Sequence, residues 1–367
     1  MKLKSKTTVR PRLIAFYLPQ FHPFKENDEW WGKGFTEWTN VAKAKPLFRG
    51  HYQPKIPADL GFYDLRLPET RELQAEMARK AGIEGFCYWH YWFGSGKRLL
   101  NRVFDEVVKT KEPKFPFCLC WANHSWFAKT WNPDTPDKLL IEQTYPGIKD
   151  YTDHFLTMLP AFKDPRYIKV NGKLVFGLFA PMDFPDFSIF KDTWNRLAKE
   201  NGLEGFYFFG YTPIYKNINR IKEQGYDSVV FDGILDCILN ENTWLHYYRA
   251  IKNRIFRHPR RTLSYQSYAN NMIRLVSNNN NFIPSIDPNF DHTPRSGYRA
   301  FVLKDSSPQL WEKLCREVFR YRQQTSHEEN LIFIKAWNEW GEGNYLEPDL
   351  KYGKAYLQAT KNALKEI

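Results

Sequence analysis

The sequence predicts a single (β/α)8 barrel, and three observations lead to this fold. The chain has 367 residues with 43% hydrophobic content, which is enough for one large core. Eight short apolar runs recur along it, most of them followed by a polar or glycine-rich segment and then a helical pattern. These runs are almost continuously apolar, as is typical of parallel strands that are covered on both faces. Eight such strands with helices between them favour a closed barrel.

The predicted elements follow in chain order. The strands span residues 12–18, 83–89, 115–121, 174–179, 205–210, 228–231, 282–286 and 331–336. One helix is predicted over 68–81 with a stop at Gly82, and another over 188–201 with a stop at the next glycine. An open, doubly wound sheet is the alternative fold. It is less well supported because no GxGxxG follows the first strand and no Walker lysine motif occurs.

Two predicted connections are long. Residues 19–67 follow the first strand, are dense in Trp, Phe and Tyr, and are expected to fold over the barrel mouth. Residues 235–281 form an insertion between strands six and seven, within a single catalytic domain over residues 1–367. Basic and apolar residues interleave in this insertion at roughly helical spacing: Arg249, Lys252, Arg254, Arg257, Arg260 and Arg261 with Trp244, Tyr247, Tyr248, Ile251, Ile255 and Phe256. Two interpretations stay open. In the first, a basic amphipathic helix contacts an anionic membrane surface or a lipid-linked glycan. In the second, which we favour, a solvated helix docks its apolar face on the barrel.

The overall charge and the cysteines suggest a setting for the protein. The net charge of +12, from 53 Lys and Arg against 41 Asp and Glu, suits an anionic partner such as a phosphate-bearing donor. We expect no nucleic-acid partner. Five cysteines without a CxxC pair indicate free buried thiols and a reducing compartment. No apolar stretch follows the basic start and no run is long enough to cross a bilayer, so the sequence predicts a cytoplasmic protein, peripheral to the inner membrane face if the insertion binds lipid.

In barrel enzymes the reactive side chains lie where the strands end. The polar residues at those ends can be read from the sequence: Tyr17, Gln20 and His22 after strand one, His90 and Tyr91 after strand two, Asn123, His124 and Ser125 after strand three, Tyr211 and Asp232 after strands five and six, Asp287 and Asp291 after strand seven, and Asn338, Glu339, Glu342 and Glu347 after strand eight.

The eighth strand end carries the most informative pattern, KAWNEWGEG at 335–343. Cleaving or making a glycosidic bond needs a proton donor at the leaving oxygen and a group that stabilises or traps the anomeric carbon. Two nearby carboxyls in different environments can divide these roles between them. The alternative is a surface turn with two solvated glutamates, but the flanking Trp337 and Trp340 disfavour it. The pattern therefore predicts Glu339 and Glu342 as catalytic carboxylates.

Other chemistries lack their motifs. His90 and His124 show no HxH or HExxH spacing, so we expect no catalytic metal and no cofactor. No GxSxG elbow is present, which disfavours a serine hydrolase. No Asp-x-Asp pair occurs either, which disfavours one common architecture of nucleotide-sugar transferases but not every glycosyl transfer.

Several motifs together resemble the WbsX family, which is itself similar to the family-99 glycoside hydrolases of the endo-α-mannosidase type. They are FYLPQFHP at 16–23, WWGKGFTEW at 30–38, GFCYWHYWF at 85–93, CWAN at 120–123 and WNEWGEG at 337–343. The match runs in order over nearly the whole chain. It departs after Asn123, where the family pattern implies an acidic residue and this sequence has His124.

The resemblance implies a barrel with its active site at the carboxyl ends of the strands. It implies that Glu339 acts on the 2-hydroxyl of the sugar, helping it attack its own anomeric carbon. Glu342 would be the general acid and then the base, and the product would retain its configuration. Further residues would contact the sugar: Tyr17, Trp89, His90, Tyr91, Trp121, Asn123, Tyr211, Asp291, Trp337, Asn338 and Trp340.

Three functions are compatible with these patterns. The first is a retaining glycosidase or transglycosylase acting on α-linked, mannose-like residues. The second is a glycosyltransferase of capsule or O-antigen assembly with an activated donor, which the basic charge favours. The third is a glycan-binding barrel without catalysis, which the intact carboxylate pair disfavours. We expect retaining glycosyl chemistry on a glycan or an activated sugar, in surface-polysaccharide biosynthesis, with its direction and the oligomeric state left open.

Overall fold

The computed structural model describes residues 9–128, 137–239, 261–322 and 326–367, with Tyr248, Ile251 and Pro259 as isolated positions. Eight parallel strands form a closed barrel: β1 (Arg12–Tyr17), β2 (Gly85–His90), β3 (Phe117–Trp121), β7 (Lys173–Leu178), β8 (Phe206–Thr212), β9 (Ser228–Asp232), β11 (Ile283–Ile286) and β13 (Leu331–Ile334). Each strand pairs with the next in this order, and β13 pairs with β1 to close the ring. The predicted (β/α)8 fold is confirmed, because every predicted apolar run supplies one barrel strand.

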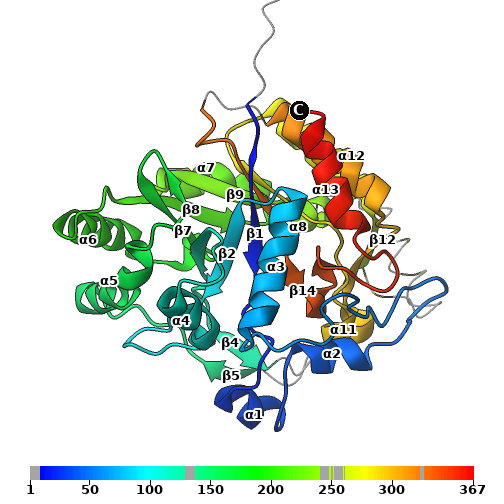
Figure 1. Cartoon of the computed structure of the whole chain (residues 1–367), viewed down its shortest axis with the longest axis horizontal. Helices are drawn as coiled ribbons and strands as arrows, with labels where there is room; N and C mark the ends of the chain where they lie inside the picture. Colours follow the sequence, from blue (N-terminus) through cyan, green and yellow to red (C-terminus); the bar gives the residue numbers. More distant parts are fainter. Residues whose placement is uncertain are drawn as a thin grey trace, which may run out of the picture.

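Helices surround the barrel and connect successive strands (Figure 1). They are α3 (Pro68–Ala81), α4 (Asn101–Thr110), α5 (Ile148–Phe162), α6 (Phe187–Glu200), α7 (Ile218–Glu223), α10 (Tyr265–Asn278), α12 (Pro308–Tyr321) and α13 (Ala355–Lys365). Helix α3 has the bounds that the sequence predicts. Proline suits its first turn, where an amide hydrogen has no partner, and Gly82 ends it with a φ of 88°, a conformation that glycine adopts without strain.

Alternation along the strands separates the barrel interior from the helix layer. Phe16 and Phe333 face inward, with ring centroids 5.1 Å apart. Gly177 makes room for the inward ring of Phe209, because a Cβ at this glycine would lie 2.2 Å from that ring. The preceding residue of the same strand, Phe176, faces outward and packs on Trp194 of α6. Both faces are therefore apolar, which explains the continuous runs in the sequence.

The connection after β1 covers the barrel mouth, as predicted. It contains α1 (Lys25–Trp31) and α2 (Glu37–Lys43). Trp38 of α2 packs 4.5 Å from Phe21 and 5.6 Å from Trp340, measured between ring centroids. Short elements complete the mouth: the hairpin β4 (Trp126–Ala128) and β5 (Lys138–Ile141), the helices η1 (Pro181–Asp183), η2 (Tyr215–Asn217), α11 (Thr293–Ser296) and η3 (Gly297–Arg299), and after β13 the turn β14 (Asn338–Glu339), η4 (Trp340–Glu342) and β15 (Asn344–Tyr345). Strand β6 (Lys169–Val170) pairs antiparallel with β7.

The insertion lies between β9 and β11, the sixth and seventh barrel strands. It opens with α8 (Gly233–Leu239), and its later β10 (Arg261–Ser264) pairs with β12 (Phe301–Lys304). Tyr248 and Ile251 are helical and exposed. The other apolar and basic residues singled out in the sequence, up to Arg260, lie outside the described residues, so the amphipathic-helix interpretation stays a prediction.

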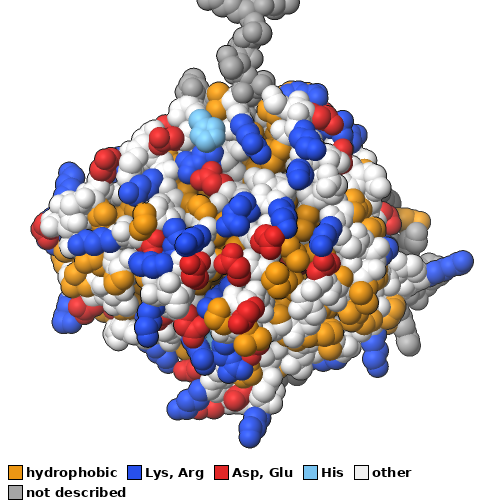
Figure 2. Space-filling model, viewed as in Figure 1, with side chains coloured by type: hydrophobic (Ala, Val, Ile, Leu, Met, Phe, Trp, Pro, Cys, Tyr) orange, Lys and Arg blue, Asp and Glu red, His pale blue; other side chains and the backbone are white. Residues whose placement is uncertain are grey.

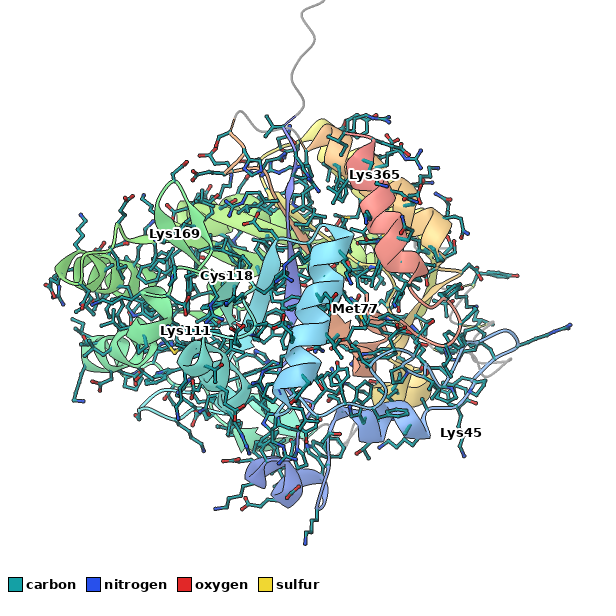
Figure 3. All side chains as sticks on the ribbon, in the orientation of Figure 1. Lys45, Met77, Lys111, Cys118, Lys169 and Lys365 are labelled. Atoms are coloured by element: carbon teal, nitrogen blue, oxygen red, sulfur yellow. The ribbon has the colours of Figure 1, made fainter. Side chains whose placement is uncertain are left out.

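The distribution of charge and thiols fits an ordinary globular surface and interior. On the face seen in Figure 2, Lys and Arg side chains are interleaved with Asp and Glu. Lys45 and Lys365 lie at the rim of the molecule, whereas Cys118 lies among the strands (Figure 3). All five cysteines are free thiols, and four of them are buried, as expected. Within the described part of the chain, no helix is both long and apolar enough to span a bilayer.

Candidate active site

The two predicted catalytic carboxylates lie on the turn that follows β13. Glu339 pairs with Asn344 in the β14–β15 hairpin, and Glu342 ends the helix η4. The backbone nitrogen of Asp291 donates to the carbonyl of Glu342 at 2.7 Å, which ties the turn to the segment after β11. Gly343 follows with a φ of 57°. A side chain there would collide with Lys55 and Asp291, so the turn packs closely on the loop beneath it.

Two cations hold Glu342 in its ionised form. Nη1 of Arg295 lies 2.7 Å from Oε1 of Glu342, and Nζ of Lys335 lies 3.8 Å from Oε2. Burial alone would raise the pKa of this carboxyl. The charges of Lys335 and Arg295 outweigh burial and lower the pKa to about 2. Glu342 is therefore a carboxylate at neutral pH.

Glu339 has the opposite environment. It is buried, and the contact that holds its carboxyl is Nε1 of Trp89, which donates to Oε1 at 2.7 Å. Burial, followed by the negative charge of Glu342, raises the pKa of Glu339 to about 7. The two carboxyl groups lie close enough for each to shift the pKa of the other. Below pH 7 the pair therefore holds about one proton, which resides mainly on Glu339.

Arg295 connects this pair to the covering loop. Its Nη2 lies 2.9 Å from Oε2 of Glu37 on α2 while its Nη1 contacts Glu342. Gly341 permits the approach, because a Cβ there would lie 1.9 Å from the Glu37 carboxylate. Both carboxylates raise the pKa of Arg295 against the effect of burial, so the guanidinium stays charged. The bridge fixes the position of α2 over the barrel mouth.

Aromatic rings form the floor beneath the carboxylates. Phe16 and Trp89 stack with centroids 4.6 Å apart, and Phe179 stacks on Tyr211 at 5.1 Å. Trp89 also meets the edge of Phe179 at 5.5 Å, which joins the two pairs. Sugars present flat C–H faces that pack on aromatic rings. Phe16 is fully buried and Trp89 and Tyr211 nearly so, so the half-buried Phe179 is the ring of this group that can offer a face to a sugar.

A polar network borders this floor on one side. The hydroxyl of Tyr211 donates to Asp232 at 2.6 Å, and Nζ of Lys335 lies 3.6 Å from the same carboxylate. Lys335 thus connects Asp232 with Glu342 and sits inside the barrel, in phase with Phe333. Tyr91 lies on the other side, packed on Trp126 of β4. Burial and then the charge of Glu339 raise the pKa of Tyr91, so its hydroxyl remains neutral.

Three of the predicted sugar contacts face the helix layer instead. Tyr17 donates its hydroxyl to Gln74 of α3 at 2.7 Å. Nε2 of His90 lies 2.7 Å from Nε2 of His154 on α5. Trp121 also points toward the helices, and its ring packs 5.0 Å from that of His154. Because strand residues alternate between faces, each of these lies one position out of phase with the floor. We therefore reinterpret all three as packing residues.

A second group of predicted contacts is occupied by bonds within the protein. Asn123 pairs both its amide atoms with the backbone of Ala180, and Asn338 does the same with Leu18. Each asparagine thereby clamps two strand ends together. Asp291 accepts from Gln53 at 2.6 Å and from the Thr293 hydroxyl at 2.6 Å, and it contacts His51 at 2.8 Å.

The two tryptophans of the last motif also have structural contacts. Trp337 is buried and packs on Phe86 at 5.3 Å. Trp340 stacks on Tyr345 at 3.7 Å, and its Nε1 donates to Glu347. Glu347 is itself buried, which raises its pKa to about 7. These contacts hold the turn that bears Glu339 and Glu342 in place, and the predicted sugar contacts of Trp337 and Trp340 stay predictions.

Sequence reasoning missed Phe179, Lys335, Arg295 and Glu37. Lys335 carried a usable signal, because it continues the inward phase of Phe333 by two residues. Arg295 and Glu37 carried none, since they reach the turn from segments that are distant in sequence. In the described part of the chain, no set of three His, Cys, Asp or Glu side chains is arranged to hold a metal ion.

Comparisons with known proteins agree with this architecture. Residues 13–360 match the family model described as Glycosyltransferase WbsX. Two curated relatives, both described as uncharacterized protein WxcX, come from two strains of Xanthomonas campestris pv. campestris. They are 34% and 33% identical over 366 residues, covering 97% of this chain and 50% of each relative. The chain thus spans about half the length of these relatives.

Solved structures share the fold. A glycoside hydrolase-like protein superposes with a TM-score of 0.61 at 15% identity, over 99% of this chain and 96% of its own. The GH99 endo-α-mannosidase of Bacteroides thetaiotaomicron gives a TM-score of 0.57 at 15% identity, with 97% of both chains covered. At this level of identity the likeness establishes the barrel fold.

Proposed function

The chain belongs to the WbsX glycosyltransferase family, and from that premise we propose that it forms or breaks glycosidic bonds with retention of configuration through Glu339 and Glu342. Family and fold make it a carbohydrate-active enzyme. The observation that carries the proposal is the divided charge of the pair. One buried carboxyl is protonated and its neighbour is ionised, above an aromatic floor at the barrel mouth.

The spacing of the pair favours neighbouring-group participation by the sugar. A carboxylate nucleophile and its acid partner normally flank the bond from about 5–5.5 Å apart. Glu339 and Glu342 instead lie three residues apart on one short turn, where each shifts the pKa of the other. A mechanism in which the sugar's 2-hydroxyl attacks needs both carboxyls near one edge of the ring, and this arrangement provides that.

The chemical step follows from these positions. Glu339 accepts the proton of the 2-hydroxyl as its oxygen bonds to the anomeric carbon, and the bond to the leaving oxygen breaks. An acceptor hydroxyl then gives its proton to Glu342 and attacks the same carbon. The 2-oxygen leaves and regains its proton from Glu339. Two inversions at the anomeric carbon give net retention.

The resting charges favour a donor that is already activated. Lys335 and Arg295 keep Glu342 ionised, and in that state it can take a proton from an acceptor but cannot give one to a leaving group. A phosphate leaving group departs without a proton. Glu339 must lose its own proton as the donor binds, and its pKa of about 7 makes that loss easy near neutral pH. We therefore propose glycosyl transfer from a phosphate-activated donor to a glycan in surface-polysaccharide assembly, on the cytoplasmic side of the membrane, by a single catalytic domain.

Hydrolysis is the second candidate, and the likeness of the barrel to an endo-α-mannosidase fold favours it. For an unactivated glycoside, Glu342 would have to be protonated before the leaving oxygen departs. Its neighbour Glu339 offers a source, because the proton of Glu339 can move to Glu342 as the substrate binds. In this version Glu342 acts as the acid and then as the base toward water.

A thermal-shift panel of nucleoside diphosphates and their sugar conjugates separates the two candidates. A donor present at about 100 times its Kd stabilises the fold by roughly 2.7 kcal/mol. A shift with the conjugates of one base, followed by a retained product anomer in NMR, supports transfer. The absence of any shift, together with release of sugar from α-mannosides, supports hydrolysis. Inverted product would overturn the retaining mechanism for both.

A further inference from the structure

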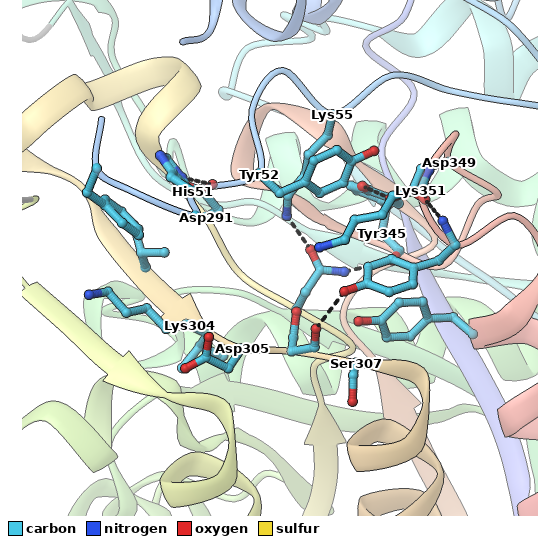
Figure 4. A pocket seen from close by; sticks show the side chains of 18 residues that line it. His51, Tyr52, Lys55, Asp291, Lys304, Asp305, Ser307, Tyr345, Asp349 and Lys351 are labelled. Atoms are coloured by element: carbon cyan, nitrogen blue, oxygen red, sulfur yellow. Dashed lines mark hydrogen bonds and ion pairs between the residues drawn. The ribbon is translucent and has the colours of Figure 1, made fainter. Parts of the chain in front are cut away.

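A cavity of about 260 Å³ lies beside the turn that bears the two carboxyl groups, neither of which lines it. Figure 4 shows the side chains that line the cavity. Three segments form most of its lining: residues 48–55 of the covering loop, 302–307 at the end of β12, and 345–356 before and within α13. Asn289 and Asp291, which follow β11, complete it. We propose that this cavity, called here the Lys55 cavity, is a second binding site that takes a sugar bearing a carboxylate or phosphate group. The sugar part of this ligand rests on the proposed function, whereas its negative charge rests on the cavity alone.

Three ammonium groups line the cavity, one from each segment: Lys55, Lys304 and Lys351. Lys55 is buried and donates to Asn289 at 2.7 Å and to the carbonyl of Gly343 at 3.0 Å. Lys351 lies over the rings of Tyr52 and Tyr352. In the part of the chain that the structure describes, neither Lys55 nor Lys351 has a carboxylate within ion-pairing distance.

The carboxylates of the cavity are largely engaged by other donors. Asp291 accepts from Gln53 and Thr293 and pairs with His51. Asp349 accepts from the hydroxyl of Tyr345 at 2.7 Å and from the backbone nitrogens of the two residues that follow Leu350. Asp305, at the rim, is exposed to solvent. The carboxylates offset part of the charge of Lys55. Lys55 and Lys351 form no direct ion pair with them among the described residues, so both ammonium groups can pair with an anionic ligand.

Two further features point to a ligand with an anionic group and hydroxyls. The 14-residue helix α12 begins at the cavity wall, where Ser307 is its N-cap, and the positive end of its dipole favours an anion there. Tyr356 lines the cavity and is 7% exposed. Its hydroxyl lies beside Ser306 without forming a well-directed hydrogen bond, so a buried polar atom remains available to a ligand.

The cavity is also mechanically connected to the catalytic turn. Lys55 bonds the carbonyl of Gly343, the residue that follows Glu342. Tyr345, whose ring lines the cavity, stacks on Trp340 of the same turn. A ligand that draws on the Lys55 ammonium therefore acts on the segment that positions the carboxylate pair. An additional sugar of a long substrate, bound in this cavity, would therefore help to hold the turn that bears the two carboxyl groups.

Calorimetric titration of the full chain tests this proposal, with glucuronic acid, glucose 6-phosphate, glucose and inorganic phosphate as the probes. We expect saturable binding of at least one of the two anionic sugars. Glucose and inorganic phosphate should each bind at least 10-fold more weakly than the better anionic sugar. Equal binding of glucose would overturn the anionic requirement, equal binding of inorganic phosphate would overturn the sugar requirement, and no binding of either anionic sugar would overturn the site.

Variants locate the binding. Lys351→Gln removes an exposed cavity charge and should weaken binding roughly 10-fold, because a charge-assisted contact is lost. Tyr356→Phe should weaken it several-fold. Lys361→Gln, an exposed lysine on α13, is the matched control and should bind like the wild type. Unchanged affinity in Lys351→Gln and Tyr356→Phe, with unchanged thermal stability, would place the ligand elsewhere.

Failure here is distinguishable from failure of the catalytic proposal. The titration is repeated in Glu342→Gln, which lies outside the cavity lining. Binding that persists there while turnover is lost supports two separate sites. Binding that disappears in Glu342→Gln would show that the probe occupies the catalytic site and would overturn the second one.

Discussion

The two faces of the same strand ends differ in what they do. Trp89 and His90 are neighbours at the end of β2, yet Trp89 faces inward and donates to Glu339, whereas His90 faces outward and contacts His154 of α5. Both side chains are almost fully buried. The inward face carries the ionisable pair Glu339 and Glu342 at the barrel mouth. On the outward face the polar side chains are paired with one another and packed against helices. Residue type therefore does not reveal function at a strand end, whereas the phase of the residue does.

The largest expected effect is a difference in kcat/KM between substitutions of Glu342 and Glu347, two glutamates of the same segment. Glu342→Gln is expected to lower kcat/KM by about 100- to 10,000-fold, because the proton-accepting group is lost. It also leaves Arg295 and Lys335 with one carboxylate fewer, so the variant should lose stability and its kcat/KM is measured on the folded fraction. Glu347→Gln is the matched change. Glu347 accepts from Gln74, Tyr63 and Trp340, and an amide cannot accept all three bonds. This variant should lose about 1–3 kcal/mol of unfolding free energy while its folded fraction stays active. Wild-type turnover in Glu342→Gln would remove Glu342 from the mechanism.

The pH profile tests whether the inward pair shares a proton. Its proton resides on Glu339, whose pKa is raised to about 7. Where bond cleavage needs that proton, as in hydrolysis, kcat/KM should be level below pH 7 and fall about tenfold per pH unit above it. Where the donor leaves as phosphate, kcat/KM should instead rise through pH 7, because Glu339 must be ionised. Initial rates from pH 5 to 9 decide between the two. Glu339→Gln should lose turnover at every pH, because an amide cannot accept the proton of the 2-hydroxyl. A profile without an inflection near pH 7 would contradict the shared proton.

A pair of tryptophans compares the two faces directly. Trp89→Phe keeps a ring on the floor but removes the donor to Glu339, and should lower kcat/KM roughly tenfold. Trp121→Phe removes an equivalent bond on the outward face, from Nε1 to the carbonyl of Trp92. It should lose about 1 kcal/mol of unfolding free energy and retain wild-type kcat/KM. The reverse result would place Trp121 at the substrate.

The outward-facing residues His90 and His154 should affect the stability of the fold and not its activity. Burial lowers the pKa of His90 and His154 well below 6.5, so the folded protein keeps both neutral. The unfolded chain binds protons on these residues as the pH falls below 6.5, which favours unfolding. The unfolding free energy in urea should therefore decrease by on the order of 1 kcal/mol per pH unit and per histidine below pH 6.5. His154→Gln should show a shallower dependence, and an unchanged slope would mean that the pair is not buried in its neutral form.

The strands and helices could be predicted from the sequence because the patterns that specify them lie within a few neighbouring residues. The apolar run at 228–231 and the one at 282–286 are short, yet both form barrel strands, β9 and β11. Proline and glycine fix the ends of α3 by backbone chemistry that needs no tertiary partner. The position of Glu339 and Glu342 on one turn after the last strand was also predictable, because two glutamates three residues apart follow the last apolar run. Their catalytic role stays a prediction.

The sequence by itself thus determined the barrel, its strand order and the turn that bears Glu339 and Glu342. Only the tertiary structure decided which side chains share the mouth with that turn. Barrel strands are apolar on both faces, so the sequence carries no alternation to tell Trp89 from Trp121. Arg295 and Glu37 reach Glu342 from segments that are remote along the chain, and closure of the barrel brings these charges together. Because a buried carboxyl takes its pKa from such neighbours, the division of charge between Glu339 and Glu342 exists only in the folded protein.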